Sequence, residues 1–284
     1  VDTDNGVITV ATTGQDIVAT SVDSSTGGAD SDDISFTTTT SGNISLGTVS
    51  SGGVGDVTIS SAGTITNAAD DAGAEVTADV FTVSTSGAIG ASDSAIDVSV
   101  GTITLGSGTS ISSAIYIDDV ATGGTTAIGG ITATGQTLTL TSTQALNITG
   151  AVTTSGSAGA TPGNAGAINI STTSGNITVG NTVKADGGND TDDAGTDGNA
   201  ATIAITAGST TRATLDINAI ISADGEVDGN DTAGSYAAVT LKGSTVDYAA
   251  NITGSDVTMN ADSDGTYTAS ETLTGYVYGN NSAI

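Results

Sequence analysis

Three copies of one short pattern decide the fold of this chain. They read Leu146-Asn-Ile148-Thr-Gly-Ala-Val152, then Ile177-Thr-Val179-Gly-Asn-Thr-Val183, then Leu215-Asp-Ile217-Asn-Ala-Ile-Ile221. Each copy places apolar residues at the same three offsets, and one residue separates the first two. Such alternation is the period of a β-strand with one buried face. A second alternating pattern follows each copy after a polar loop, with its apolar pairs at Ile168/Ile170, Ile203/Ile205 and Val239/Leu241.

The spacing of these patterns predicts how the strands are arranged. The first patterns begin 31 and 38 residues apart and the second patterns 35 and 36, so length varies in the loops while the strands keep their offsets. One such unit cannot bury its apolar face alone, whereas stacked copies bury a continuous thin core. We therefore predict an all-β parallel β-solenoid, or β-helix. An array of β-sandwich domains is the alternative.

The organisation along the chain follows from the same patterns. Residues 1–140 are predicted to be solenoid coils with short loops, and residues 141–260 coils with long acidic loops. Residues 261–284 are predicted to be a C-terminal coil, or a cap and assembly segment. Since the chain starts at Val1 without Met, we expect a processed product or an excised part of a longer protein.

Composition narrows the classes of partner. The 284 residues include 41 Gly and one Pro, and only 3% are aromatic. Three cations face 31 acids, which gives a formal net charge of -28. Nucleic acid is an unsuitable partner because phosphate binding needs clustered Lys or Arg. No stretch approaches the roughly 20 apolar residues of a membrane-spanning helix.

The chemistry of the chain argues against an enzyme. With no His and no Cys, the chain lacks Ser-His-Asp and Cys-His catalysis and thiolate or imidazole metal sites. Acid pairs at Asp70/Asp71, Asp118/Asp119 and Asp192/Asp193 would suffice for glycoside hydrolysis. Carbohydrate clefts usually add aromatic platforms, however, and this chain has no Trp. We interpret the pairs as solvated turn carboxylates and predict no catalytic residue and no organic cofactor.

Two long loops are the candidate ion site. Their acids are Asp186, Asp190, Asp192, Asp193 and Asp197 in one loop, and Asp224, Glu226, Asp228 and Asp231 in the corresponding loop of the next coil. Ca²⁺ takes six to eight oxygen ligands, which stacked acidic loops can supply. The alternative is a hydrated acidic edge that salt neutralises diffusely.

The two ends of the chain are candidate assembly segments. The N-terminal segment carries Val7, Ile8 and Val10, and the C-terminal segment carries Tyr276, Val277 and Tyr278. A solenoid exposes open strand edges at its ends, and tyrosines suit a buried contact. We predict end-to-end self-association or continuation into further coils. The alternative is an aromatic cap that closes the last coil.

The style of the repeats suggests a family. Ser-Gly-Asn-Ile-Thr-Val-Gly at 174–180 and Gly-Asn-Ala-Gly-Ala-Ile-Asn-Ile at 163–170, with the Gly and Asp loops between them, resemble the central repeats of filamentous-haemagglutinin-type large exoproteins and adhesins of bacteria. The resemblance implies right-handed winding, secretion to the prokaryotic cell surface and an adhesive or scaffolding role. Its implied partners are a cell-surface glycan or a protein receptor.

These features predict an extracellular structural protein, the stalk or fibre segment of a surface adhesin or self-assembling filament. The alternative is a binding module in which one solenoid face recognises a glycan, a host surface or ice. Thr rows such as Thr137/Thr139/Thr141 motivate the ice hypothesis, although Thr also suits any exposed strand.

Overall fold

The computed structural model of the chain describes residues 1–3, 6–25, 32–68, 73–107, 109–192, 195–225, 232–261, 271–274 and 282–283. Contacts divide it into two units. Unit 1 comprises Val1–Thr132 and Ser142–Gln144, and unit 2 comprises Ala133–Thr141 and Ala145–Ile284. The described ranges hold no helix with the length and hydropathy to span a membrane.

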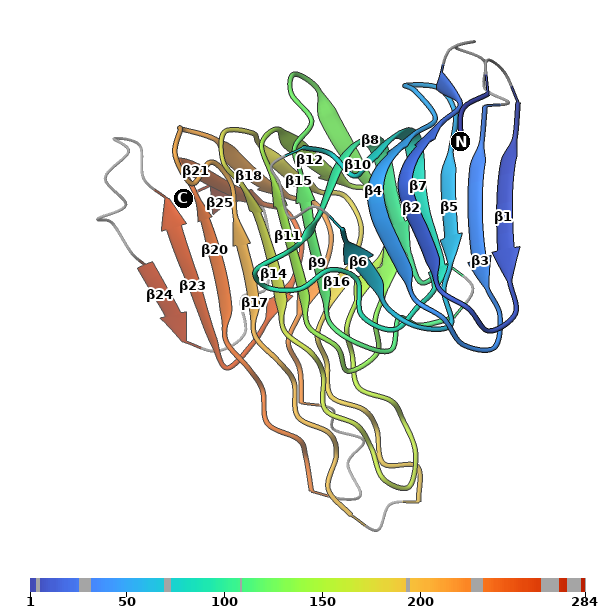
Figure 1. Cartoon of the computed structure of the whole chain (residues 1–284). Helices are drawn as coiled ribbons and strands as arrows, with labels where there is room; N and C mark the ends of the chain where they lie inside the picture. The colour runs from blue at the N-terminus through green and yellow to red at the C-terminus, as the bar shows by residue number, and fades with distance from the viewer. Residues whose placement is uncertain are drawn as a thin grey trace. The chain divides into compact units, whose positions relative to one another are not determined.

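Unit 1 is built from short strands that pair in parallel, one coil on the next (Figure 1). Between them, Gly, Ser, Asp and Asn form the corners, as expected for residues that favour turns. The strands are β1 (Ile8–Thr12), β2 (Ile17–Asp23), β3 (Ile34–Thr38), β4 (Ile44–Ser50), β5 (Val57–Ser60), β6 (Ile65–Asn67), β7 (Val76–Thr85), β8 (Ile96–Leu105), β9 (Ile115–Asp119) and β10 (Thr125–Thr132).

The register of unit 1 stacks like residues on like. Because side chains alternate along a strand, each coil sends one residue of every pair inward, where it lies on the equivalent residue of the next coil. Buried apolar columns result, three of which are Ile8, Ile34, Val57, Phe81 and Ile103; Ile17, Ile44, Ile65, Ile89 and Ile115; and Val22, Val49, Val76 and Val98.

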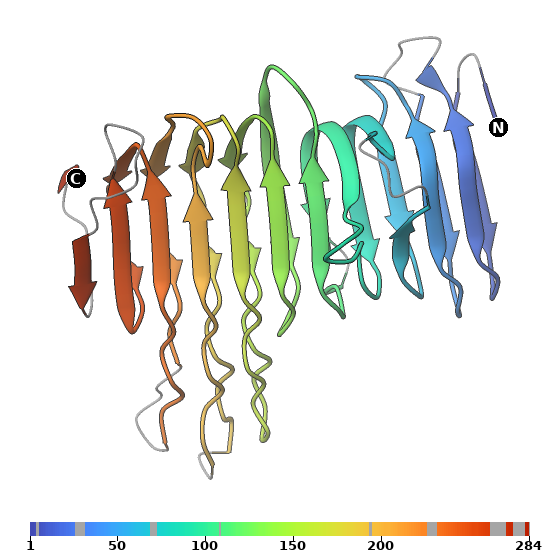
Figure 2. The ribbon, with the colours of Figure 1, turned by 60° about the vertical axis from the view of Figure 1, so that its left-hand side comes forward.

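Unit 2 repeats this plan with shorter strands (Figure 2). They are β11 (Leu138–Ser142, whose last residue belongs to unit 1), β12 (Ala145–Ile148), β13 (Val152–Thr153), β14 (Ile168–Thr172), β15 (Ile177–Val179), β16 (Val183–Lys184), β17 (Ile203–Thr206), β18 (Thr214–Ile217), β19 (Ile221–Ser222), β20 (Val239–Gly243), β21 (Thr245–Tyr248), β22 (Ile252–Thr253), β23 (Asp256–Ala261), β24 (Glu271–Thr274) and β25 (Ser282–Ala283).

Unit 2 also has buried columns, and they contain the sequence repeats. Three of the columns are Leu146, Ile177, Leu215 and Val246; Val152, Val183, Ile221 and Ile252; and Ile168, Ile203, Val239 and Val257. Residues at equal offsets in the predicted copies are therefore direct partners. The parallel β-solenoid is confirmed, and the β-sandwich alternative is wrong because the ladders that carry the repeats are parallel.

The C-terminal part of unit 2 departs from the parallel pattern. β24 pairs with β23 in an antiparallel ladder, and β25 pairs in the same manner with β21. The outer edges of β21 and β23 are thus each paired with an antiparallel strand. Most of the predicted segment 261–284 lies outside the described residues.

Candidate functional site

The long loops of unit 2 form the most distinctive surface feature of that unit. Residues 154–166, 185–201 and 223–237 leave their coils after β13, β16 and β19 and return to β14, β17 and β20. We call these three segments the loop stack; it is described except for residues 193–194 and 226–231. In Figure 2 the loops project side by side from one end of their strands.

Backbone hydrogen bonds run through the loop stack from layer to layer. The Gly156 N–H donates to the Asp186 carbonyl at 2.8 Å, and the Gly187 N–H donates to the Asp224 carbonyl at the same distance. On the returning arms, the Ala165 N–H donates to the Asn199 carbonyl at 2.9 Å. The loops are therefore an ordered continuation of the solenoid ladder.

Glycine makes this close stacking feasible. A Cβ added to Gly187 would overlap the Gly198 carbonyl oxygen across the same loop, and one added to Gly198 would overlap the Gly163 carbonyl oxygen of the preceding loop. The Gly198 N–H donates to the Gly188 carbonyl at 2.8 Å. The arms thus pack backbone against backbone with no space for side chains.

Asparagine side chains link the layers at the corners. The Asn164 Oδ1 accepts the Asn199 N–H at 2.8 Å, and the Asn199 Oδ1 accepts the Ser235 N–H at 2.9 Å. The Asn176 Oδ1 accepts the Thr214 N–H at 2.8 Å in the same way. Asn164 and Asn199 each follow a Gly at equal repeat offsets, so the sequence carries a signal for this Asn ladder. The apolar offsets alone do not reveal it.

At the base of the loop stack, the structure brings Asp186 and Asp224 together. The Asp186 Oδ1 accepts the Asp224 N–H at 3.0 Å, and the Lys184 Nζ lies 3.5 Å from the Asp186 Oδ2. Burial raises the pKa of Asp224, and the Asp186 charge adds to the rise, whereas a hydrogen bond from Tyr236 and the Lys184 charge oppose it. These two acids of the predicted ion site thus lie in adjacent layers and repel each other, and the Lys184 ammonium group is close to Asp186.

At the tip of the second loop, the structure brings Asp190 and Asp197 together. The residues are 1% and 2% exposed. The Asp190 N–H donates to the Asp197 Oδ1 at 2.8 Å, and the Asp192 N–H donates to the Asp190 Oδ1 at 3.2 Å. Among the described residues, none donates a hydrogen bond to the Oδ2 atom of either buried carboxylate or to the buried Asn189 Oδ1. The tip therefore holds carboxylate oxygens to which the described part of the chain offers no donor.

Most of the other predicted ligands at the loop tips are not placed by the structure. Asp192 is exposed. Asp193, Glu226, Asp228 and Asp231 lie outside the described residues. Within the described ranges, no group of three or more Asp, Glu, His or Cys side chains is placed to hold a metal ion. A cation at the tip would rely on two carboxylates and on neutral oxygens.

The predicted assembly residues are placed only at the N-terminal end. Ile8 points into the core of unit 1, Val7 is 61% exposed and Val10 is half-buried. Among the described strands, β1 pairs with β3 alone, so one backbone edge of β1 has no strand partner there. Tyr276, Val277 and Tyr278 lie outside the described residues.

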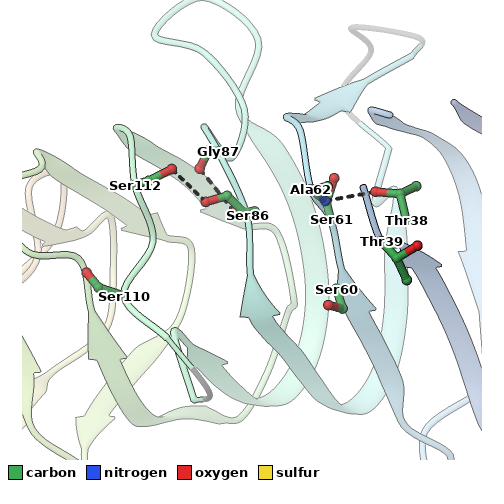
Figure 3. A pocket seen from close by; sticks show the side chains of 9 residues that line it. All are labelled: Thr38, Thr39, Ser60, Ser61, Ala62, Ser86, Gly87, Ser110 and Ser112. Atoms are coloured by element: carbon green, nitrogen blue, oxygen red, sulfur yellow. Dashed lines mark hydrogen bonds between the residues drawn. The ribbon is translucent and has the colours of Figure 1, made fainter. Parts of the chain in front are cut away.

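A hollow lined by hydroxyl groups follows one corner of unit 1 (Figure 3). Its internal hydrogen bonds include Ser112 Oγ to the Ser86 carbonyl at 3.1 Å and the Ala62 N–H to Thr38 Oγ1 at 2.8 Å. None of its side chains titrates near neutral pH, so it offers polar contacts without an acid or base. The lining residues are Thr38, Thr39, Ser60, Ser61, Ala62, Ser86, Gly87, Ser110 and Ser112.

One carboxylate that we interpreted as a solvated turn residue is buried. Asp119 is 1% exposed and continues the Val98 column of unit 1. Its Oδ2 accepts hydrogen bonds from Thr126 Oγ1 at 2.6 Å and from Ser142 Oγ at 2.8 Å. For Asp119 the sequence interpretation was therefore wrong. The neighbouring Asp118 is half-buried, and desolvation raises the pKa of its carboxyl group.

Comparison of the chain with protein-family models, with curated proteins and with solved structures finds no match in any of the three.

Proposed function

We propose that this chain is an extracellular structural protein, a stalk or fibre segment of a prokaryotic surface adhesin or filament. The observation that carries the proposal is the in-register stacking within each unit, where the backbone hydrogen bonds and the apolar columns continue from one described coil to the next. Adding coils to such a ladder adds length without a new kind of contact. The repeat resemblance to bacterial exoproteins supports the same role.

Length that scales with coil number is the property to test. Variants with one, two or three extra copies of residues 168–202 insert whole coils, because Ile168 and Ile203 are register partners. Each copy should lengthen the particle by about 4.8 Å. Small-angle scattering should show a growing maximum dimension at constant cross-section. Growth in all directions would contradict a stalk.

The surface location needs its own test. Antibodies raised against the 284-residue chain should label intact, unpermeabilised cells of the organism that makes it. Labelling that appears only after permeabilisation would contradict an extracellular role. The two tests are independent. If the variants lengthen as expected but the antibodies label only permeabilised cells, the structural role stands and the extracellular location does not.

We further propose that the free edge of β1 is where the ladder continues, by a further coil of the same polypeptide or by a second copy. The edge exposes backbone donors and acceptors beside the exposed Val7. Sedimentation of the purified chain should show concentration-dependent association, and Thr9→Pro in β1 should weaken it because Pro removes a backbone donor. A chain that stays monomeric at high concentration leaves only the continuous-polypeptide form.

A binding role is the second candidate, favoured by the hydroxyl-lined hollow of unit 1 (Figure 3). Hydroxyl groups recognise neutral polar ligands such as glycans by hydrogen bonding. A glycan array would test this role, and Ser86→Val should abolish any signal. Thermal hysteresis would test the ice hypothesis. Silence in both assays would leave the structural role.

A further inference from the structure

The tip of the second long loop poses an electrostatic problem. Asp190 and Asp197 are both nearly fully buried, seven residues apart and joined by the bond from the Asp190 N–H to the Asp197 Oδ1. Each keeps one buried oxygen that receives no hydrogen bond from any residue in the described ranges. A buried carboxylate oxygen without a partner is costly, and two such groups in one loop also repel each other.

The described protein supplies no compensating positive charge at this place. Among the described residues, Lys184 forms its ion pair with Asp186, at the base of the loop stack. Lys242 and Arg212, the other two cations of the chain, lie in β20 and just before β18 rather than in these loops. Two ways to neutralise the pair remain, namely a bound cation or a proton shared between the carboxylates.

We infer that the tip binds one Ca²⁺ ion through the Oδ2 atoms of Asp190 and Asp197. Carboxylate and amide oxygens are the ligands of hard cations, and Ca²⁺ accepts irregular loop geometry more readily than Mg²⁺, which requires a near-ideal octahedron. The Asn189 Oδ1 is a third buried oxygen without a donor in the same loop. Water and backbone carbonyls complete the coordination, since two carboxylates alone are too few.

The glycine at 195 fits this assignment. A Cβ at this position would lie 2.7 Å from the Asp190 Oδ2, in the space beside the oxygen that has no donor. The missing side chain at Gly195 therefore leaves room beside that oxygen. The ion would tie the outgoing arm at Asp190 to the returning arm at Asp197, and would stabilise the loop in proportion to its occupancy. This inference does not depend on the proposed stalk function.

Isothermal titration of the full chain with CaCl₂ tests the site at constant ionic strength. We expect one saturable site per chain, and Asp197→Asn and Asp190→Asn should each weaken binding at least about tenfold because each removes a charged ligand. Asp192→Asn is the matched control: it makes the same charge change in the same loop at an exposed side chain, and should change affinity less than about threefold.

A second variant keeps every charge. Gly195→Ala should weaken Ca²⁺ binding while circular dichroism stays β, so a loss there cannot come from reduced acidity. The proposal is overturned if the wild-type chain shows no saturable binding, or if all three Asp variants lose affinity equally. It is also overturned if Ca²⁺ raises the melting temperature no more than NaCl does at matched ionic strength.

Discussion

At the residue scale, Asp119 shows how a charge can serve as a core residue. It lies where the third column of unit 1 would otherwise continue with an apolar side chain, and Thr126 and Ser142 donate to the same carboxylate oxygen. The Gln144 Nε2 in turn donates to Thr126 Oγ1 at 2.7 Å. A network in which each polar group has a partner tolerates burial, whereas loss of one member leaves the others unpaired.

We therefore expect Asp119→Ala to lower the free energy of unfolding by about 2–4 kcal/mol. Urea denaturation followed by circular dichroism measures the change. Asp247→Ala, at an exposed side chain, should stay within about 0.5 kcal/mol of the wild type. Equal effects of the two substitutions would mean that the buried network adds nothing to stability.

The raised pKa of Asp224 predicts a pH dependence with a definite sign. A carboxyl group whose pKa is higher in the folded state favours folding when protonated, so its contribution is present at low pH and is lost as pH rises through the folded-state pKa. At pH 7, Asp224→Asn should raise the melting temperature by about 1–3 °C, because Asn removes the repulsion from Asp186 and still accepts from Tyr236.

Acidification should reduce that advantage. Between pH 7 and pH 4 the wild type should gain on Asp224→Asn, as protonation of Asp224 achieves what the substitution does. Differential scanning calorimetry of both proteins across this range measures the difference. A gap that widens toward low pH would show that the Asp224 pKa is lowered, contrary to the burial seen at the base of the loop stack.

At the scale of elements, the apolar columns could be predicted from the sequence and the buried acids could not. Period-two alternation is local, so a short window identifies each of Ile168, Ile203 and Val239 as an inward-facing residue, and their equal repeat offsets then assign them to one column. Burial of Asp119 depends instead on Ser142, 23 residues away on another strand. Whether Asp119 is buried or exposed, the local sequence shows only an acid beside a turn, and such acids are usually solvated.

The loop stack divides in the same way. Its Gly and Asp composition predicted stacked polar loops, and the structure places Asp186 on Asp224 as expected of layers in register. Composition gave no means to separate the buried Asp190 and Asp197 from the exposed Asp192. Asp197 accepts the Asp190 N–H, and nothing in the local sequence indicates this hydrogen bond between residues seven positions apart.

The backbone contact of the loop arms yields the third prediction. Gly198→Ala should destabilise unit 2 by about 1–3 kcal/mol, because the added methyl group overlaps the Gly163 carbonyl oxygen and the Gly188 backbone nitrogen, which cannot move independently of the ladder. Gly53→Ala is the control, since a Cβ at Gly53 has no neighbour within 4 Å. Urea midpoints measure both. An unaffected Gly198→Ala variant would mean that the loop layers separate freely.

At the scale of the whole molecule, charge is the dominant opposing force. A formal charge of -28 rests on 31 acids and three cations. Parallel stacking brings acids of successive coils near one another, as Asp216 beside Asp247 on β18 and β21 illustrates. Self-repulsion of this size destabilises a compact state, and it acts on exposed carboxylates as well as on the buried ones.

Salt should therefore stabilise the fold. Raising NaCl from 10 to 500 mM, with a chelator present to exclude divalent ions, shortens the screening length from about 30 Å to roughly 4 Å. Repulsion between exposed carboxylates of neighbouring coils then falls, and the melting temperature should rise by several degrees. KCl should give the same curve as NaCl, because screening depends on ionic strength. A melting temperature that stays constant or falls with salt would show that the acids are already neutralised within the fold.

The Ca²⁺ effect inferred for the loop tip is separable from this salt effect. It should saturate at a single equivalent of Ca²⁺ and persist at 500 mM NaCl, where little repulsion between exposed groups remains to be screened.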